Sequence, residues 1–127
     1  MTYNLNALLE RAKETAEKAY APYSGYRVGS ALLCKDGSIF TGCNIENSSY
    51  SLTLCAERVA LFKAVSEGQR EFVALAIYVD SDKLFPPCGA CRQVISEFAD
   101  DLRIVYASRL ETIESTISEL LPGAFRL

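Results

Sequence analysis

The most informative stretch of the sequence is Pro86-Pro87-Cys88-Gly89-Ala90-Cys91-Arg92-Gln93, which opens a run of helical periodicity. Cys88 and Cys91 are three residues apart, so both sulfurs can point at one centre from the first turn of a helix over 89–98. Unpaired backbone N–H groups and the positive end of the helix dipole favour thiolate over thiol at that turn. Pro87 precedes the helix, where a missing N–H group costs nothing. The stretch therefore predicts a helix N-terminus that presents two reactive sulfurs.

A second motif, Cys55-Ala56-Glu57-Arg58, provides a third sulfur near the start of another helical run. Three protein ligands leave the fourth tetrahedral position of a zinc ion open, which is the arrangement of a catalytic zinc. Glu57 is then expected to act as a base beside that position rather than as a fourth ligand. A zinc-bound hydroxide attacks an electrophilic carbon while such a carboxylate carries the proton to a leaving nitrogen. The two motifs thus predict a catalytic zinc at Cys55, Cys88 and Cys91.

A cation is expected beside the sulfurs, because three thiolates outweigh the charge of one Zn²⁺ in a partly buried place. Arg58 and Arg92 belong to the same two motifs, and either guanidinium can donate N–H groups to the sulfurs. We favour Arg58, because its helix must also present Glu57.

Two other interpretations of the cysteines stay open. Cys88 and Cys91 alone resemble a disulfide redox pair, although that function would give no use to Cys55. A closed structural zinc site would need a fourth ligand, which Cys34 or Cys43 could supply because the chain has no histidine. Both of these cysteines end predicted strands, where small buried cysteines are common, and we expect both to lie in the core.

Composition limits the partners of the chain. Its 127 residues, half of them hydrophobic and 23% charged, predict one globular domain over 1–127 with a sizeable core. A net charge of −3 argues against a nucleic-acid partner or an anionic membrane surface. No apolar run has transmembrane length, and the N-terminus lacks the pattern of a secretory signal. We therefore expect a cytoplasmic protein whose five cysteines serve thiol or metal chemistry rather than disulfides.

Periodicity predicts a helix, then a hairpin, then strands that alternate with helices. Asp36-Gly37 is a strong hairpin signal, and Gly29 within a strand indicates a bulge or a close backbone approach. Helices are expected over 4–19, 54–67 and 89–98, with a weak helical turn over 117–121. Strands are expected over 26–34, 38–43, 72–79, 102–107 and 112–117. This order predicts an α/β fold, namely a three-layer α/β/α domain with a mixed five-stranded sheet.

The polar segment 44–53 has two interpretations that the residues alone leave open. It is either a solvated loop or, because it lies between the hairpin and the Cys55 motif, a loop that binds substrate.

Several blocks of the chain are similar to the small, homotetrameric, zinc-dependent cytidine deaminases of the cytidine/deoxycytidylate deaminase superfamily. A Cys-Ala-Glu motif followed some thirty residues later by Pro-Cys-x-x-Cys is the signature of zinc deaminases, with cysteine allowed in place of histidine. The blocks are Tyr20-Ala21-Pro22-Tyr23-Ser24, Gly42-Cys43-Asn44-Ile45-Glu46-Asn47, Cys55-Ala56-Glu57-Arg58, Lys63-Ala64-Val65-Ser66-Glu67-Gly68, Pro87-Cys88-Gly89-Ala90-Cys91-Arg92-Gln93 and Leu120-Leu121-Pro122-Gly123-Ala124-Phe125. The resemblance spans nearly the whole chain and is weakest over 71–86.

The resemblance implies a reaction, a cofactor and an assembly. The reaction is hydrolytic deamination of cytidine and 2′-deoxycytidine to uridine and 2′-deoxyuridine, with release of ammonia, as in pyrimidine salvage. The expected cofactor is one Zn²⁺ per chain, held by Cys55, Cys88 and Cys91. Hydroxide on that zinc would attack C4 of the base, and Glu57 would carry protons to N3 and to the departing amine. The expected partners are a small nucleoside and three further copies of the chain.

The resemblance also implies contacts with the substrate. Asn44 and Glu46 would bind the ribose hydroxyls, which favours the substrate-loop interpretation of 44–53. Tyr26, at a position where relatives usually carry phenylalanine, would stack on the pyrimidine. The backbone around Ala56 and Pro87 would meet the base. Two further aromatic residues would reach the active site of a neighbouring subunit, namely Tyr50 and Phe125.

Two rival functions remain. One is a different zinc deaminase on the same scaffold, acting on a modified base, a nucleoside antibiotic or nucleic acid. The other is a zinc-binding module without catalytic activity, in which Glu57 would have no chemical role. A panel of substrates would distinguish the leading function from the first rival. Contacts with ribose should make free cytosine a poor substrate of a nucleoside deaminase.

Overall fold

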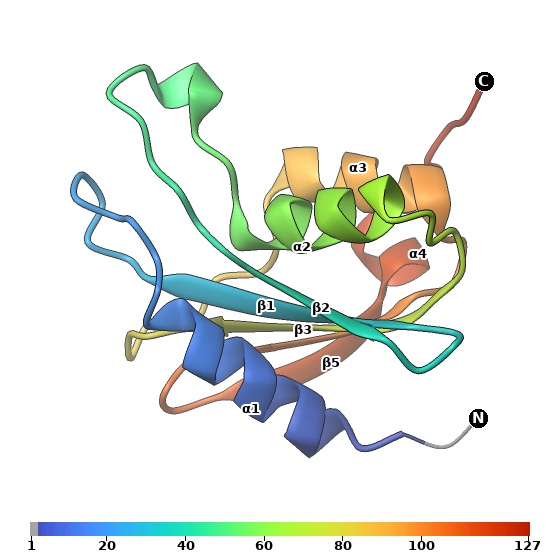
Figure 1. Ribbon diagram of the computed structural model, residues 1–127, viewed down its shortest axis with the longest axis horizontal. Coiled ribbons are helices and arrows are strands. Elements are labelled where there is room, and N and C mark those ends of the chain that lie inside the picture. The colour runs from blue at the N-terminus through green and yellow to red at the C-terminus, as the bar shows by residue number, and fades with distance from the viewer. Residues whose placement is uncertain (1–2) are drawn as a thin grey trace.

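The computed structural model describes residues 3–127, which form four α-helices, five strands and one short 3₁₀ helix. Figure 1 shows their arrangement along the chain. The helices are α1 (Leu5–Ala16), α2 (Ala56–Ser66), α3 (Gly89–Phe98) and α4 (Ile117–Leu120), with η1 at Tyr50–Leu52. The strands are β1 (Val28–Cys34), β2 (Ile39–Cys43), β3 (Phe72–Val79), β4 (Arg103–Ala107) and β5 (Thr112–Thr116).

The strands form one sheet in the order β2-β1-β3-β4-β5. The central pair, β3 and β4, is parallel, and all other neighbouring pairs are antiparallel. The predicted mixed five-stranded sheet is confirmed, with the apolar run 72–79 as its middle strand and 112–116 at one edge. Parallel strands place their carboxyl ends at the same edge of a sheet, which is where ligand sites of such folds lie.

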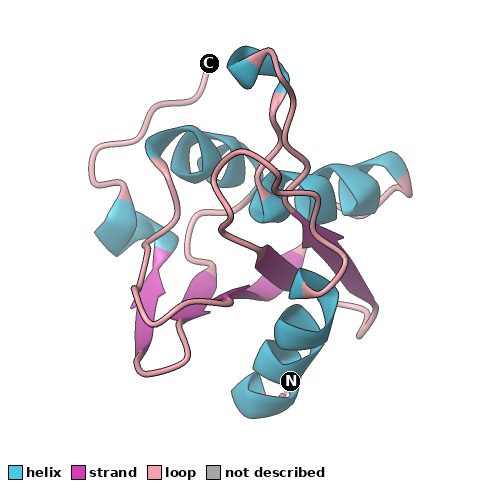
Figure 2. Ribbon diagram, turned by 90° about the vertical axis from the view of Figure 1, so that its left-hand side faces the viewer, coloured by secondary structure: helices cyan, strands magenta, loops and turns pink. Residues whose placement is uncertain are grey.

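Helices cover both faces of the sheet. Helix α1 packs on one face, whereas α2, α3 and α4 lie on the other (Figures 1 and 2). The core accordingly has two parts, one on each side: Leu32, Leu75 and Ile104 are buried beneath α2 and α3, and Ala31 and Ala76 face α1. Strand β3 is buried on both sides, and its sequence is accordingly apolar throughout rather than alternating; β1 is buried likewise but contains Ser30. The predicted three-layer α/β/α architecture is confirmed.

Two glycines allow helices to approach the sheet closely. A Cβ atom on Gly29 would lie 1.9 Å from the carbonyl oxygen of Ala12 in α1, and one on Gly42 would lie 2.5 Å from that of Ala56 in α2. Real side chains do not tolerate such distances, so only glycine fits at either position. The expected close approach at Gly29 is confirmed, while the irregularity of strand β1 falls between Leu33 and Cys34 instead.

Several helices and strands were predicted to be longer than they are, and local hydrogen bonds explain the difference. Helix α1 begins at Leu5, because Asn4 caps it by accepting hydrogen bonds from the backbone N–H groups of Asn6 and Ala7. It ends at Ala16, and a turn at 17–18 takes the place of the last turn of the helix predicted over 4–19. The helix predicted over 54–67 begins only at Ala56, since Cys55 has an extended backbone and is its N-cap.

The first strand begins at Val28 rather than at Tyr26, because the carbonyl of Tyr26 and the N–H group of Val28 are bonded to the side chain of Asn44 instead of to a strand. The other strands agree with prediction to within one residue. The predicted turns at two glycines are confirmed. Gly37 adopts a positive φ after strand β1, and Gly68 does so after helix α2. Within residues 3–127, none of the helices has the length and apolarity needed to cross a membrane.

Candidate metal centre and pocket

Three cysteine sulfurs meet where helices α2 and α3 begin. Cys55 is the N-cap of α2, Cys88 is the N-cap of α3, and Cys91 lies in the first turn of α3. The Sγ atoms of Cys55 and Cys88 are 3.8 Å apart, those of Cys88 and Cys91 are 3.3 Å apart, and all three lie within 4.8 Å of one another. Tetrahedral zinc with Zn–S bonds of about 2.3 Å holds its sulfurs about 3.8 Å apart. The three residues are therefore placed to hold a zinc ion.

The protonation of the sulfurs supports this interpretation. The hydrogen bond from Cys91, together with that from Arg58, lowers the pKa of Cys55 to about 5. The same bond to Cys55 raises the pKa of Cys91, because this thiol supplies the shared proton. Sulfurs so close together cannot all ionise unless a cation lies between them. The donor set is thus suited to a divalent ion that prefers thiolate, as zinc does.

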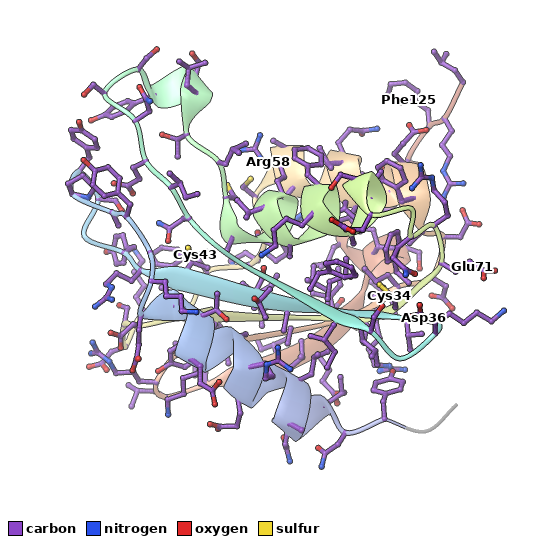
Figure 3. All side chains as sticks on the ribbon, in the orientation of Figure 1. Cys34, Asp36, Cys43, Arg58, Glu71 and Phe125 are labelled. Carbon is purple, nitrogen blue, oxygen red and sulfur yellow. The ribbon has the colours of Figure 1, made fainter. Side chains whose placement is uncertain are left out.

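The structure places Arg58 rather than Arg92 beside the sulfurs, as favoured from the sequence. Nη2 of Arg58 lies 3.5 Å from Sγ of Cys55, and this hydrogen bond raises the pKa of the guanidinium (Figure 3). Arg92 instead donates to two backbone carbonyl oxygens, those of Pro87 at 2.7 Å and Leu120 at 2.8 Å. Arg58 can therefore offset negative charge on the sulfurs, whereas Arg92 ties the loop before Cys88 to the end of α4.

Glu57 lies in the first turn of α2 with only 5% of its surface exposed. Burial raises its pKa to about 7, and the negative charge of Cys55 adds to the effect. A carboxyl group with such a pKa can both accept and release a proton near neutral pH, which is what general acid–base catalysis needs. Its position beside Cys55 gives it access to the metal centre.

A pocket of about 270 Å³ opens beside the sulfurs and Glu57. Its floor is formed by apolar residues near the carboxyl ends of β3 and β4, among them Val79 and Ala107. Tyr26, Phe85 and Pro86 form further parts of the wall. Three polar side chains also line the pocket: Ser24, Asn44 and Glu46. The pocket thus combines metal-binding sulfurs and a buried carboxyl group with apolar walls and hydrogen-bonding side chains.

Asn44 and Glu46 face the pocket because Ile45 between them pairs with two other segments in extended form. The Oδ1 atom of Asn44 accepts from the N–H group of Val28 at 2.9 Å, and Nδ2 donates to the carbonyl of Tyr26 at 2.8 Å. One amide hydrogen and one lone pair of Asn44 remain for a ligand. The side chain of Asn44 therefore holds the loop together as well as facing the pocket.

Glu46 is oriented by the loop that precedes β1. Its carboxylate accepts hydrogen bonds from the N–H groups of Tyr23 at 2.9 Å and Ser24 at 3.1 Å, and from the hydroxyl of Ser24. The hydroxyl bond is the main cause of the lowered pKa of Glu46. An ionised and fixed carboxylate in the pocket can accept hydrogen bonds from a hydroxylated ligand.

The other predicted contacts fall into two groups. Tyr26 and Ala56 line the pocket, although the carbonyl of Ala56 already accepts a hydrogen bond from the buried hydroxyl of Ser30 at 2.7 Å. Tyr50 and Phe125 do not line the pocket of their own chain; they are 75% and 69% exposed. Phe125 lies beside the C-terminus, well away from the sulfurs near Arg58 (Figure 3). Their expected role in a neighbouring subunit stays a prediction.

Three residues of the site were missed from sequence. Ser24 orients Glu46, Ser30 fixes the start of α2, and Phe85 forms part of the pocket wall. A serine inside an apolar strand was a signal for Ser30, because a buried hydroxyl needs a partner. Phe85 could have been suspected only from its position three residues before Cys88.

Cys34 and Cys43 lie apart from the three clustered sulfurs. Cys34 is buried beside the hairpin turn, at the end of β1 remote from the metal centre, and Cys43 is half-buried at the end of β2 (Figure 3). Among the residues that the structure describes, the three clustered cysteines form the only group able to hold a metal ion. A closed site with a fourth cysteine therefore has no support.

Comparison with known proteins points to one family. A family model of the cytidine and deoxycytidylate deaminase zinc-binding region matches residues 2–108. A cytidine deaminase from Sporosarcina psychrophila is 52% identical over 124 residues, which cover 96% of this chain and 91% of that protein. The crystal structure of cytidine deaminase from Burkholderia pseudomallei matches with a TM-score of 0.91 at 46% identity, covering 98% of this chain and 100% of that one.

A more distant relative has a different name. A blasticidin-S deaminase from Bacillus cereus is 33% identical over 132 residues, covering 95% of this chain and 94% of that protein.

Proposed function

The chain belongs to the cytidine and deoxycytidylate deaminase family, and we propose that it hydrolyses cytidine and 2′-deoxycytidine to uridine and 2′-deoxyuridine with release of ammonia. One observation supports this more than any other. Sulfurs of the cysteine cluster and buried Glu57 line the same pocket as Asn44 and Glu46. This combination suits a base that reacts beside the metal ligands and bears a hydroxylated sugar.

Cys55, Cys88 and Cys91 would hold one Zn²⁺ per chain, and Arg58 would offset part of their negative charge. When bound, zinc lowers the pKa of water and so supplies a nucleophile near neutral pH. Glu57 would carry the two protons of the attacking water in turn, the first to N3 of the base and the second to the departing amine. In the net reaction, a C4–O bond forms and the C4–N bond breaks, so that cytidine and water become uridine and ammonia.

The polar side chains of the pocket bind the sugar. Glu46 accepts hydrogen bonds from ribose hydroxyls, and Asn44 offers its remaining N–H group. Tyr26 packs against the base. Among the described residues that line the pocket, none is lysine or arginine, and Glu46 would repel a phosphate group. We therefore propose a free nucleoside, rather than a nucleotide or nucleic acid, as the substrate.

We further propose that residues 1–127 act as a single catalytic domain of a cytoplasmic homotetramer that serves pyrimidine salvage. The exposure of Tyr50 and Phe125 supports the assembly, because large aromatic side chains that project from a surface are typical of protein contacts. In the tetramer, each would complete the site of a neighbouring subunit.

The first test is the ultraviolet spectrum of cytidine incubated with the purified zinc-loaded protein and with its Glu57→Gln variant. We expect the wild type to convert cytidine to uridine and the variant to be slower by at least about 10²-fold, because an amide cannot carry the proton. Zinc content should be equal in both. No conversion by wild-type protein with one zinc per chain would overturn the cytidine assignment, and equal conversion by both proteins would overturn the role of Glu57.

Similarity to a blasticidin-S deaminase supports one alternative, namely an aminated pyrimidine nucleoside antibiotic as the substrate. A panel of cytidine, 2′-deoxycytidine, cytosine and blasticidin S would distinguish the two. Contacts of Asn44 and Glu46 with ribose should make free cytosine the poorest of the four. Turnover of blasticidin S alone would replace the cytidine assignment. Zinc content without turnover of any compound would instead favour a non-catalytic zinc module.

A further inference from the structure

The ring of Phe85 forms a fixed part of the pocket wall. It packs edge-to-face against the ring of Tyr26, with centroids 4.8 Å apart and planes at 75°. The ammonium group of Lys83 lies 5.3 Å from the centroid of the Phe85 ring. Pro86 and Pro87 follow directly and restrict the backbone on that side. A ring held by an aromatic neighbour, a cation and a stiff backbone cannot easily move aside for a larger ligand.

The proposed function fixes which edge of the base meets this wall. C4 lies at the metal centre, and N1 points to Asn44 and Glu46 because it bears the sugar. Glu57 delivers its proton to N3, so the N3 edge faces the start of α2. The opposite edge of the ring, C5 and C6, then faces away from α2. Phe85 and Pro86 line the pocket from the loop that leads to Cys88 and α3, not from α2.

The chemistry of the two edges agrees with this orientation. N3 and the C2 carbonyl need hydrogen-bonding partners, which the first turn of α2 can offer through Glu57 and unpaired backbone N–H groups. C5 and C6 carry only hydrogen and are best placed against apolar groups, which the aromatic ring of Phe85 supplies. A substituent on C5 would be directed at that ring.

We propose that Phe85 is the residue that limits substitution at C5 of the pyrimidine, so that the enzyme selects cytidine against its 5-alkyl derivatives through contact with this ring. The inference rests on the proposed function, because it uses the orientation of cytidine that this function requires. Tyr26 takes part by holding the Phe85 ring in place.

The test compares wild-type protein with Phe85→Ala on cytidine, 5-methylcytidine and 5-ethylcytidine. The measured quantity is kcat/KM for each derivative divided by kcat/KM for cytidine with the same enzyme, so that any general loss of activity cancels. One methylene group in an apolar pocket changes kcat/KM by roughly 10- to 200-fold. We expect the relative value for 5-ethylcytidine to rise at least about 10-fold in Phe85→Ala, and less for 5-methylcytidine.

Leu84→Ala is the matched control. Leu84 lies in the same loop but packs against the core on the α2–α3 face of the sheet and does not line the pocket. Its truncation loosens the loop without opening the wall, so the relative values should stay as in wild type. If Phe85→Ala does not fold, Phe85→Leu tests the same wall and should give a smaller rise.

The outcomes separate this inference from the function on which it rests. Unchanged ratios in a Phe85 variant that still deaminates cytidine would overturn the role of Phe85 and leave the proposed function intact. An equal rise in Leu84→Ala would also overturn it, because the effect would then come from loop mobility. Failure of the wild type to deaminate cytidine would instead refute the proposed function, and with it the orientation of the base.

Discussion

At the scale of single residues, metal and proton chemistry admit few residue types, and this constraint determines which side chains form the metal centre. In a chain without histidine, only cysteine and carboxylate side chains could build the site, and the spacing of Cys88 and Cys91 at a helix start left little choice. Ser24 and Phe85 escaped prediction because they come from irregular segments. The side chains that an irregular loop places in a pocket depend on how the loop folds. No periodic pattern in the sequence predicts that placement.

Arg58 provides a prediction at the same scale. Arg58→Gln removes the positive charge next to Cys55 and leaves three sulfurs whose mutual repulsion is opposed by zinc alone. Loss of a group that bonds to a metal ligand typically costs about 10- to 100-fold in metal affinity or activity. We expect Arg58→Gln to release zinc to a chromogenic chelator at lower chelator concentration than wild type does. Arg92→Gln is the control, because it removes the same charge from an arginine that bonds only to backbone carbonyls. Equal zinc loss in both variants would contradict a direct action of Arg58 on the sulfurs.

At the scale of elements, periodicity located every α-helix and strand of the described residues but overran several ends, and it missed the short 3₁₀ helix at Tyr50–Leu52. The segment from Leu54 to Cys55 fits a helical pattern of apolar residues, yet Leu54 is paired in a bridge with Ile45 and Cys55 caps the helix. Hydrogen bonds with distant segments decided these ends, and a periodic pattern does not record them. The placement of α2 matters for function, because its first turn presents Cys55 and Glu57.

Gly42 makes that placement testable. In Gly42→Ala the added Cβ would lie 2.5 Å from the carbonyl of Ala56 and 2.6 Å from the backbone nitrogen of Ala60, so α2 must move away from β2. Overpacking of this kind costs roughly 1–3 kcal/mol of the free energy of unfolding. We expect a lower midpoint in urea unfolding together with weaker zinc binding. Gly89→Ala is the stability control, since its Cβ would meet no atom within 4 Å; a wild-type midpoint for Gly42→Ala would refute the close-contact explanation.

At the scale of the whole molecule, the layers and the mixed sheet followed from the order of elements, whereas the assembly did not. A buried strand is recognisable because it is apolar throughout, but an exposed aromatic residue such as Phe125 has the same sequence signature whether it meets solvent or another subunit. The proposed shared active site therefore rests on family membership and on the fact that Phe125 does not line the pocket of its own chain.

Hetero-oligomers of two defective chains test that sharing directly. A Phe125→Ala chain keeps Glu57 and the cysteines but lacks the aromatic ring that it would lend to a neighbour. A Glu57→Gln chain cannot carry the proton but keeps Phe125. If sites are completed between subunits, co-expressed and co-purified mixtures place Phe125 from one chain beside Glu57 of the other. We therefore expect the deamination rate of these mixtures, per intact Glu57, to exceed that of pure Phe125→Ala protein.

The control mixture combines Phe125→Ala with a chain that carries both substitutions and therefore has no aromatic ring to offer to a neighbour. Equal rates in the two mixtures, from oligomers of the same mass by light scattering, would show that Phe125 acts only within its own chain or not at all.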